Sequence, residues 1–239
     1  MARKRIQHPF EINGFQHSEA AHIPLDRERI TQSAIRLLNE FGLKELSMRK
    51  VAEDLMVKPA SLYYHVKSKD ELLQWMADHI SSELTQHDPS LPWAEQVLQW
   101  GEQYRRVLHN YRDAVEIFNS TIASGYNRLT QIEKLFQILA AAGFQDSQIP
   151  WMASMLKNYV LGFVTEEVQL RSIAGQHDTT QEQLSEQYNK FYNNLPKDKF
   201  PNMIRLAPYM TNTDWQSEFQ FGLGVLIDGL LAKLPSVPS

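Results

Sequence analysis

The sequence predicts an all-α fold, in which an N-terminal three-helix helix-turn-helix domain is joined to a longer C-terminal helical domain. Apolar residues recur at the three- and four-residue spacing of amphipathic helices along most of the chain after residue 24. No credible β alternation and no internal repeat interrupts this spacing. With 239 residues, 43% of them hydrophobic, the chain can bury a sizeable core in one or two domains. We expect an arm at residues 1–23 and domains at 24–70 and 71–235.

The first two expected helices have clear start signals. Asp26 can cap a helix that carries one apolar face and ends at Gly42. Ser47 can accept a hydrogen bond from the free N–H groups of a short helix that starts at Met48. The apolar residues of these two helices are Ile30, Ala34, Leu37, Leu38, Val51, Ala52 and Leu55.

A tight turn at Met56 and Val57 separates the second helix from the third. Pro59 supplies a preset φ angle for the first turn of that third helix, and Leu62 and Val66 face inward. Its outer face carries hydroxyl, aromatic, imidazole and ammonium groups but no acid, which suits the major groove of DNA. The outer-face candidates are Lys58, Ala60, Ser61, Tyr63, Tyr64 and His65.

Helical spacing continues towards the C-terminus with a few breaks. Ser68 and Glu71 make a capping box that opens a long helix running to about Gln86. We expect a polar loop at 172–180 and a short irregular segment at 196–208. The remaining expected helices cover 93–108, 126–142, 149–171, 181–193 and 214–234.

The last expected helix has an apolar arc wider than one neighbouring helix needs, and it contains three glycines that would let another helix approach closely. One interpretation is a central helix buried within its own domain. We favour a homodimer interface, because DNA readers of this kind usually bind two half-sites as a two-fold dimer. The residues concerned are Leu226, Ile227, Leu230, Leu231, Gly222, Gly224 and Gly229.

Charge and composition restrict the remaining possibilities. Net charge is −4, yet residues 1–70 carry 12 Lys and Arg against 9 Asp and Glu, and residues 71–239 carry 12 against 19. Residues 1–23 contain the basic cluster Arg3-Lys4-Arg5 and are expected to be disordered, or alternatively to reach the minor groove of DNA. Without cysteine or an apolar run of about 20 residues, we expect a cytoplasmic protein with no membrane partner.

From about Leu25 to Leu84 the sequence resembles the TetR family of one-component transcriptional repressors. The matching segments are AIRLLNEFG at 34–42, LSMRKVA at 46–52 and LYYHVKSK at 62–69, the last being the most specific. Met56 stands where the family usually has a turn glycine, which reaches a left-handed conformation without strain. The resemblance adds three residues to the expected DNA contacts, namely Arg49, Pro59 and Lys69.

The C-terminal region resembles the tetracycline-repressor subgroup at residues 111–114, 161–167 and 221–230. The subgroup binds its drug through two histidines, an asparagine, a phenylalanine, a threonine and a glutamate that comes from the other subunit. Here Thr85 and Phe118 stand at the histidine positions, and Trp100 and Tyr104 stand at the asparagine and phenylalanine positions. The retained residues are Thr121 and Glu166.

Because Phe118 cannot coordinate Mg²⁺, we expect no metal site, no cofactor and no response to a metal–tetracycline chelate. Thr121 and Glu166 would be the polar points of a cavity for a small apolar or aromatic effector. Its expected aromatic lining is Trp100, Tyr104, Phe118 and Tyr159, although aromatic residues at helical spacing are equally compatible with plain core.

The resemblance implies a homodimeric, ligand-responsive repressor that binds a double-stranded operator and pairs through a four-helix bundle made of residues 149–171 and 214–234. Ligand would favour a dimer whose recognition helices are spaced wrongly for one turn of DNA. Catalysis is not expected, because the chain has no H-E-x-x-H, G-x-S-x-G, P-loop or G-x-G-x-x-G motif. The alternative is a helical protein-binding adaptor without DNA function.

Overall fold

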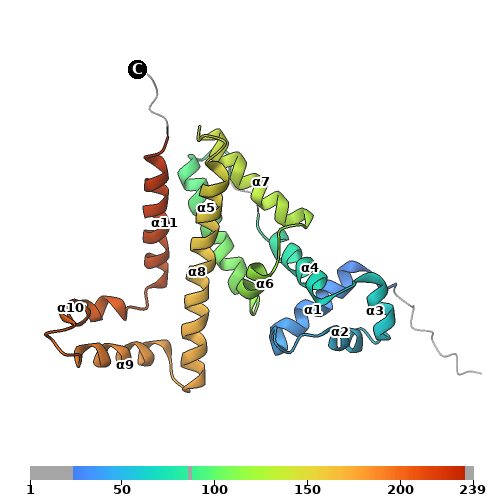
Figure 1. The fold of residues 1–239 in the computed structure, drawn as a ribbon, viewed down its shortest axis with the longest axis horizontal. Coiled ribbons are helices and arrows are strands. Elements are labelled where there is room, and N and C mark those ends of the chain that lie inside the picture. The colour runs from blue at the N-terminus through green and yellow to red at the C-terminus, as the bar shows by residue number, and fades with distance from the viewer. Residues whose placement is uncertain (1–23, 86–87, 235–239) are drawn as a thin grey trace, which may run out of the picture.

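The computed structural model describes residues 24–85 and 88–234, and this part of the chain is all-helical, as the sequence predicts (Figure 1). The expected arm at 1–23 lies outside the described residues. None of the described helices is both long and apolar enough to cross a membrane. The helices are α1 (Arg27–Phe41), α2 (Met48–Asp54), α3 (Pro59–His65), α4 (Lys69–Ser82), α5 (Trp93–His109), α6 (Ala114–Ser120), α7 (Tyr126–Ala141), α8 (Ile149–Gln176), α9 (Gln181–Asn193), α10 (Pro201–Met210) and α11 (Trp215–Leu231).

Side-chain caps set the starts of the N-terminal helices. Asp26, Ser47 and Ser68 each accept a hydrogen bond from the backbone N–H three residues further on, at 2.8, 3.3 and 3.1 Å. These three caps confirm the predicted starts of α1, α2 and α4. The capping box at α4 closes differently from the prediction, because Glu71 Oε2 accepts from the backbone N–H of Lys67, at 2.7 Å, instead of that of Ser68.

The helix α4 ends at Ser82, earlier than the predicted end near Gln86. Leu84 is buried in the C-terminal core just beyond it, and its carbonyl accepts a hydrogen bond from Gln131 Nε2 on α7 at 3.0 Å. A carbonyl engaged by a neighbouring helix does not need an intrahelical partner, so the chain can leave the helix here.

The helix α8 extends beyond its predicted end into the segment expected to be a polar loop. Ala174 is buried near the end of α8, where α9 folds back against it. The chain turns only at Asp178, whose φ of 48° is left-handed. Burial of one small apolar residue therefore outweighs the polar character of its neighbours.

Two further helices were not predicted. The segment expected to be irregular contains α10, which Pro201 opens at a position where a backbone N–H has no partner to lose. The short α6 follows Asp113, which has a left-handed φ of 54° and accepts a hydrogen bond from the backbone N–H of Leu43 at 2.8 Å. Ile117 of α6 is fully buried in the N-terminal core. Tertiary contacts thus fix α6 more than local propensity does.

Two hydrophobic cores meet along α4. The first lies among α1–α4 and includes Ile30, Leu62 and Met76, while the second lies among α5–α8 and α11. Ile80 of α4 belongs to the second core, one turn after Met76. One helix is therefore packed in both cores, which makes α4 the structural link between the two halves of the chain.

The last helix has both an inward and an outward apolar face. Phe219, Leu223, Ile227 and Leu230 are buried in the chain's own core. Gly222 accommodates Tyr159 of α8, because an added Cβ would overlap the tyrosine hydroxyl. Ile227, Leu230 and Gly222 therefore serve packing within the chain. The outward apolar residues of α11 are Phe221, Val225 and Leu231.

Candidate DNA-binding face and ligand cavity

The turn between α2 and α3 takes the strained conformation that the sequence suggests. Met56 has a φ of 54°, in the left-handed region that glycine enters at little cost. Its backbone N–H donates to the Glu53 carbonyl at 3.0 Å, and the next N–H, of Val57, donates to the Ala52 carbonyl at 2.9 Å. The turn keeps its geometry without glycine, at a cost of roughly 1–2 kcal/mol.

The helix α3 buries one face and exposes the other. Leu62 and Val66 are fully buried in the N-terminal core, so the opposite face must point to solvent. That face carries exposed residues at most of the positions expected to contact DNA, with His65 half-buried at the end of the helix. The exposed residues on and just before α3 are Lys58, Pro59, Ala60, Ser61, Tyr63 and Tyr64.

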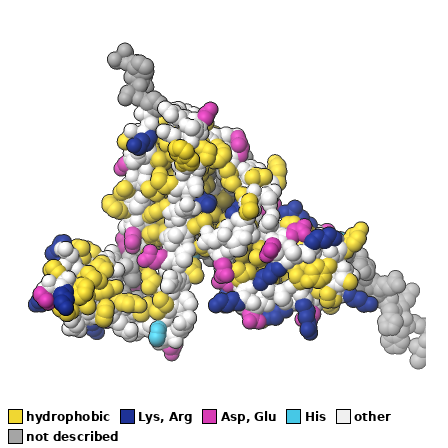
Figure 2. Space-filling view, in the orientation of Figure 1, with side chains coloured by type: hydrophobic (Ala, Val, Ile, Leu, Met, Phe, Trp, Pro, Cys, Tyr) yellow, Lys and Arg dark blue, Asp and Glu magenta, His cyan; other side chains and the backbone are white. Residues whose placement is uncertain are grey.

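The expected contacts outside α3 have partners within the chain. Arg49 on α2 is exposed, and its Nε donates to Glu53 at 2.7 Å. Lys69 at the start of α4 is half-buried and donates to the Leu43 carbonyl at 3.2 Å. The Nη groups of Arg49 stay free to donate to DNA while Nε is bound to Glu53. Figure 2 shows Lys and Arg side chains gathered over the α1–α3 end of the molecule.

One basic residue of this face was not among the predicted contacts. Lys67 follows α3, and its Nζ donates to the carbonyls of Tyr63 at 3.1 Å and Tyr64 at 2.7 Å. The same ammonium lies 5.5 Å from the centroid of the Tyr64 ring. Lys67 therefore satisfies the carbonyls at the end of α3 and fixes Tyr64. The sequence offered no signal to separate this role from a phosphate contact.

A cavity of about 380 Å³ lies among α4–α8. Four of the residues predicted from the sequence line it, namely Trp100, Tyr104, Phe118 and Thr121. Their rings form a continuous wall, since the Trp100 and Tyr104 centroids are 5.4 Å apart and those of Tyr104 and Phe118 are 5.7 Å apart. The mostly apolar wall with a few polar groups is typical of a small-molecule site.

The other two predicted effector residues lie elsewhere. Tyr159 stacks on Phe219, with 5.5 Å between centroids, and donates its hydroxyl hydrogen to the Phe219 carbonyl at 2.9 Å. Glu166 is exposed on α8 and lines a separate cavity of about 320 Å³ with residues of α9–α11, among them Trp215. Within one chain, the structure does not bring Tyr159 and Glu166 to the aromatic cavity.

The sequence analysis did not predict six polar residues that line the aromatic cavity, namely Ser81, Asn119, Arg128, Gln131, Ser154 and Lys157. Arg128 donates from Nη1 to Thr121 Oγ1 at 2.7 Å and from Nη2 to the Phe118 carbonyl at 3.1 Å. Its guanidinium carbon lies 4.8 Å from the Phe118 ring centroid, a cation–π geometry. Burial lowers the pKa of Arg128, while Tyr104 and Asp78 oppose that effect. The aromatic pattern that drew attention to α5 and α6 could not reveal a partner on α7.

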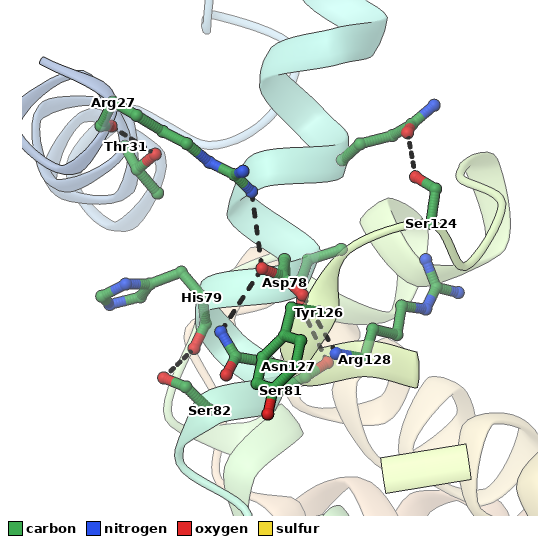
Figure 3. Close-up of polar contacts among 12 residues, drawn as sticks. Arg27, Thr31, Asp78, His79, Ser81, Ser82, Ser124, Tyr126, Asn127 and Arg128 are labelled. Carbon is green, nitrogen blue, oxygen red and sulfur yellow. Dashed lines mark hydrogen bonds and ion pairs between the residues drawn. The ribbon is translucent and has the colours of Figure 1, made fainter. Parts of the chain in front are cut away.

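Asp78 of α4 connects this cavity to the DNA-binding domain, as Figure 3 shows. Its carboxylate accepts hydrogen bonds from the backbone N–H of Arg128 at 3.0 Å, from Asn127 Nδ2 at 3.3 Å and from Arg27 Nη2 at 3.4 Å. Gly125, which precedes α7, has no side chain to cap that helix, and an added Cβ would overlap Asp78. Asp78 thus caps α7 from a neighbouring helix and ties it to α1.

A second buried carboxylate holds α5 against α8. The side chain of Glu167 is 1% exposed and forms ion pairs with Arg105 at 2.6 Å and His109 at 2.7 Å. Burial alone would raise the pKa of Glu167, but hydrogen bonds and charge from His109 and Arg105 outweigh it and hold the pKa at about 2. Across the described residues, no group of three or more His, Asp or Glu side chains could hold a metal ion.

An exposed, acid-free helix placed by a tight turn, and supported by a separate helical domain, defines a DNA-binding transcriptional regulator of the helix-turn-helix class. The chain belongs to the TetR family. Residues 30–76 match the model of the bacterial regulatory proteins of the tetR family, and residues 87–234 match that of the tetracyclin repressor-like C-terminal domain. The resemblance seen in the sequence is confirmed. Homologues in this family are transcriptional regulators and not enzymes, as we expected.

Several known proteins are similar over most of this chain. A helix-turn-helix transcriptional regulator of Saccharopolyspora erythraea is 30% identical, covering 87% of this chain and 85% of the relative. The class D tetracycline repressor of Escherichia coli is 26% identical, covering 89% and 92%. The crystal structure of the Streptomyces coelicolor TetR family protein ActR in complex with actinorhodin is 31% identical, with a TM-score of 0.79 and coverage of 89% and 98%.

Proposed function

We propose that this chain is a homodimeric cytoplasmic repressor that leaves its operator when a small apolar or aromatic effector occupies the cavity among α4–α8. The observation that carries this proposal is the position of α4, which belongs to both cores and contributes Ser81 to the cavity wall. A ligand in the cavity therefore touches the helix on which the DNA-binding domain is mounted. The ActR relative, whose crystal structure holds a small molecule, supports the ligand-binding part.

In this proposal α3 enters the major groove. Arg49, Lys58, Ala60 and Ser61 lie nearest the base edges, with Pro59 placing the start of the helix against the groove. The residues that hold phosphates are Tyr63, Tyr64, His65 and Lys69. All of them lie on or just before α3, apart from Arg49 on the adjacent α2 and Lys69 at the start of α4. One such helix offers few base contacts, which is why two copies are needed.

The proposed dimer interface is the outward face of α8 and α11. Phe221 is 74% exposed and Val225 is 54% exposed on α11, and Met155 and Val168 are exposed on α8. A Cβ added at Gly224 would meet no atom within 4 Å, so a partner helix can approach closely there. Figure 2 shows hydrophobic side chains over this part of the molecule. Pairing through this face would form a four-helix bundle.

The proposed switch runs through Asp78. An effector that contacts Arg128 acts on the first turn of α7, where Asp78 is bound, and one that contacts Phe118 of α6 acts there through the hydrogen bond of Arg128 to the Phe118 carbonyl. Asp78 is also bound to Arg27 of α1, so a shift at α7 changes the support of the DNA-binding domain. The effector needs only a higher affinity for the state in which the two α3 helices are wrongly spaced.

A metal–tetracycline chelate does not fit this cavity. The described residues that line it include no Asp, Glu or His, so they offer Mg²⁺ few of the oxygen or nitrogen ligands that it needs. Glu166, which the resemblance assigns to drug binding across the dimer, would be the nearest candidate from a second subunit. We therefore propose that tetracycline with Mg²⁺ neither stabilises the protein nor releases it from DNA.

A mobility-shift experiment with the DNA upstream of the protein's own gene tests the DNA-binding part. We expect a discrete complex with this fragment at a protein concentration that leaves a random duplex of the same length unbound. The complex should vanish in a Ser61→Glu variant, whose acid would lie against the base edges and be repelled by the DNA, and should persist in an Ala140→Glu variant at an exposed position of α7 as control. Failure to prefer any genomic fragment would instead favour a protein-binding adaptor.

A further inference from the structure

The lining of the aromatic cavity has a charge of one sign. Arg128 of α7 and Lys157 of α8 both line it, and among the described residues no Asp or Glu does. The surrounding domain is acidic, with residues 71–239 carrying 19 Asp and Glu against 12 Lys and Arg. The positive charge of this cavity therefore contrasts with the net negative charge of the domain around it.

Neither cation forms an ion pair with a described residue. The guanidinium of Arg128 donates to the neutral oxygens of Thr121 and Phe118, and no carboxylate lies within ion-pair distance of it among the described residues. Asp78 binds the backbone N–H of Arg128 and directs its other carboxylate oxygen to Arg27. Lys157, half-buried, has no ion pair or hydrogen bond to any described residue. Arg128 is partly buried without an ion pair, which is costly, and Lys157 adds a second positive charge, so an incoming anion gains from both.

The position of Arg128 also matches a carboxylate geometrically. Its hydrogen bonds to Thr121 and Phe118 and its stacking on the Phe118 ring hold the guanidinium in place before a ligand arrives. A guanidinium has five N–H donors in a planar fork, so further donors remain for a bidentate pair with a carboxylate. The rings of Trp100 and Tyr104 lie on the same cavity wall and offer an apolar surface to the rest of the ligand.

Gln131 favours a ligand that carries a hydrogen-bond donor. The side chain is 8% exposed and lines the cavity, and its Nε2 donates to the Leu84 carbonyl at 3.0 Å. Its Oε1 is buried and has no hydrogen-bond partner in the described part of the chain. A buried acceptor of this kind is usually satisfied, and a ligand hydroxyl group can do so here.

We propose that the effector is an aromatic acid, deprotonated at neutral pH, whose carboxylate pairs with Arg128 and Lys157 while its rings lie against Trp100, Tyr104 and Phe118. This inference rests on the proposed function, because it assumes that the cavity holds the effector. It goes further in excluding neutral and cationic aromatic compounds as good ligands. A hydroxyl substituent within reach of Gln131 strengthens binding.

Sets of compounds that differ only in charge test the inference. For naphthalene, biphenyl and anthracene scaffolds, the carboxylate, the carboxamide and the methylammonium derivative are compared by thermal shift, and those that bind are measured by titration calorimetry. The carboxylate of a scaffold should bind best. Its affinity should fall by about 10–100-fold in Arg128→Gln, because a hydrogen bond to a charged group is lost, and recover in part in Arg128→Lys.

Controls separate charge from folding. Lys157→Gln provides a second test on another helix and should also weaken the carboxylate, while Arg106→Gln, on the exposed face of α5, should leave its affinity unchanged. Equal affinities for the carboxylate and the carboxamide, or an unaltered carboxylate affinity in both Arg128→Gln and Lys157→Gln, would overturn the inference alone. Absence of binding by every compound would count against the ligand cavity, and with it the proposed function.

Discussion

At the scale of single residues, Glu167 shows how a buried charge is retained. The carboxylate is almost fully buried between α5 and α8, yet Arg105 and His109 donate to both of its oxygens. Removing a charge that is paired in this way leaves the Arg105 cation without its partner and the His109 ring without its hydrogen bond, which costs more than the pair itself contributes. Its neighbour Glu166 is exposed, so the two adjacent glutamates differ in their burial.

Glu167 contributes to the stability of the folded protein, and this contribution is lost in acid. Because its pKa is lowered to about 2 from 4.5, its contribution is complete above about pH 4.5 and is lost as the pH falls towards 2. We expect Glu167→Gln to lower the free energy of unfolding at pH 7 by roughly 2–4 kcal/mol and to flatten its decline between pH 5 and 3. Thermal melts followed by circular dichroism measure this, with Glu166→Gln as control. Parallel pH profiles for Glu167→Gln and wild type would contradict it.

Arg49 and Lys69 are expected to affect DNA binding in different ways. Replacing Arg49 by Ala should weaken binding to the operator by about 1–3 kcal/mol and relax sequence preference, because contacts to base edges determine which sequence is bound. Replacing Lys69 by Ala should weaken all duplexes and lower the salt slope by about one unit. Fluorescence anisotropy on operator and random DNA at several salt concentrations measures both, with Lys134→Ala on α7 as control. Equal losses on the two duplexes for both variants would refute the assignment.

Residue patterns predicted the cavity only in part. The aromatic residues of α5 and α6 could be found because they follow helical spacing and match positions of a known subgroup. Arg128 and Lys157 could not, since any exposed helix carries such residues and only packing decides which of them face a cavity. Tyr159 was misleading because its ring fits against Gly222 of the last helix, a contact between segments far apart in the sequence.

At the scale of elements, local chemistry predicts where a helix begins better than whether it exists. Asp26, Ser47 and Ser68 cap their helices as predicted, because a cap depends on only a few adjacent residues. The helix α6 is stabilised by contacts of Asp113 and Ile117 with the N-terminal domain. A pattern of neighbouring residues in the sequence cannot predict such contacts. The helix α7 starts at Tyr126 as predicted, but the group that caps it, Asp78, is on α4 and not among the adjacent residues.

A glycine at position 56, in the turn between α2 and α3, should stabilise the folded protein. Met56 is 92% exposed, so its side chain contributes little packing, while its positive φ carries strain. We expect Met56→Gly to raise the free energy of unfolding by about 0.5–1 kcal/mol, since the relief of strain exceeds the added entropy of the unfolded chain. Urea unfolding at fixed protein concentration measures this. Met56→Ala is the control, because alanine keeps the strained φ, and a gain of equal size in that variant would rule out this explanation.

At the scale of the whole molecule, assembly depends on apolar residues that one chain leaves exposed. Phe221→Asp or Val225→Asp should place a charge in the proposed interface without disturbing the chain's own core, whereas Leu230→Asp would also test folding. We expect both outward variants to sediment as monomers at micromolar concentration and to lose operator affinity. Ala140→Asp at an exposed position of α7 is the control. A monomeric wild-type protein under the same conditions would rule out the interface.

The central claim is that occupancy of the cavity controls DNA binding, and one titration tests it most directly. A labelled duplex from the upstream region is saturated with the wild-type dimer, and its anisotropy is followed while an aromatic compound that raises the melting temperature is added. A ligand at a hundredfold excess over its Kd stabilises the folded state by about 2.7 kcal/mol. We predict that the duplex is released, and that Phe118→Ala requires much more ligand although it binds DNA normally without it. Retention of the duplex at saturating ligand, or release driven by tetracycline with Mg²⁺, would contradict the account.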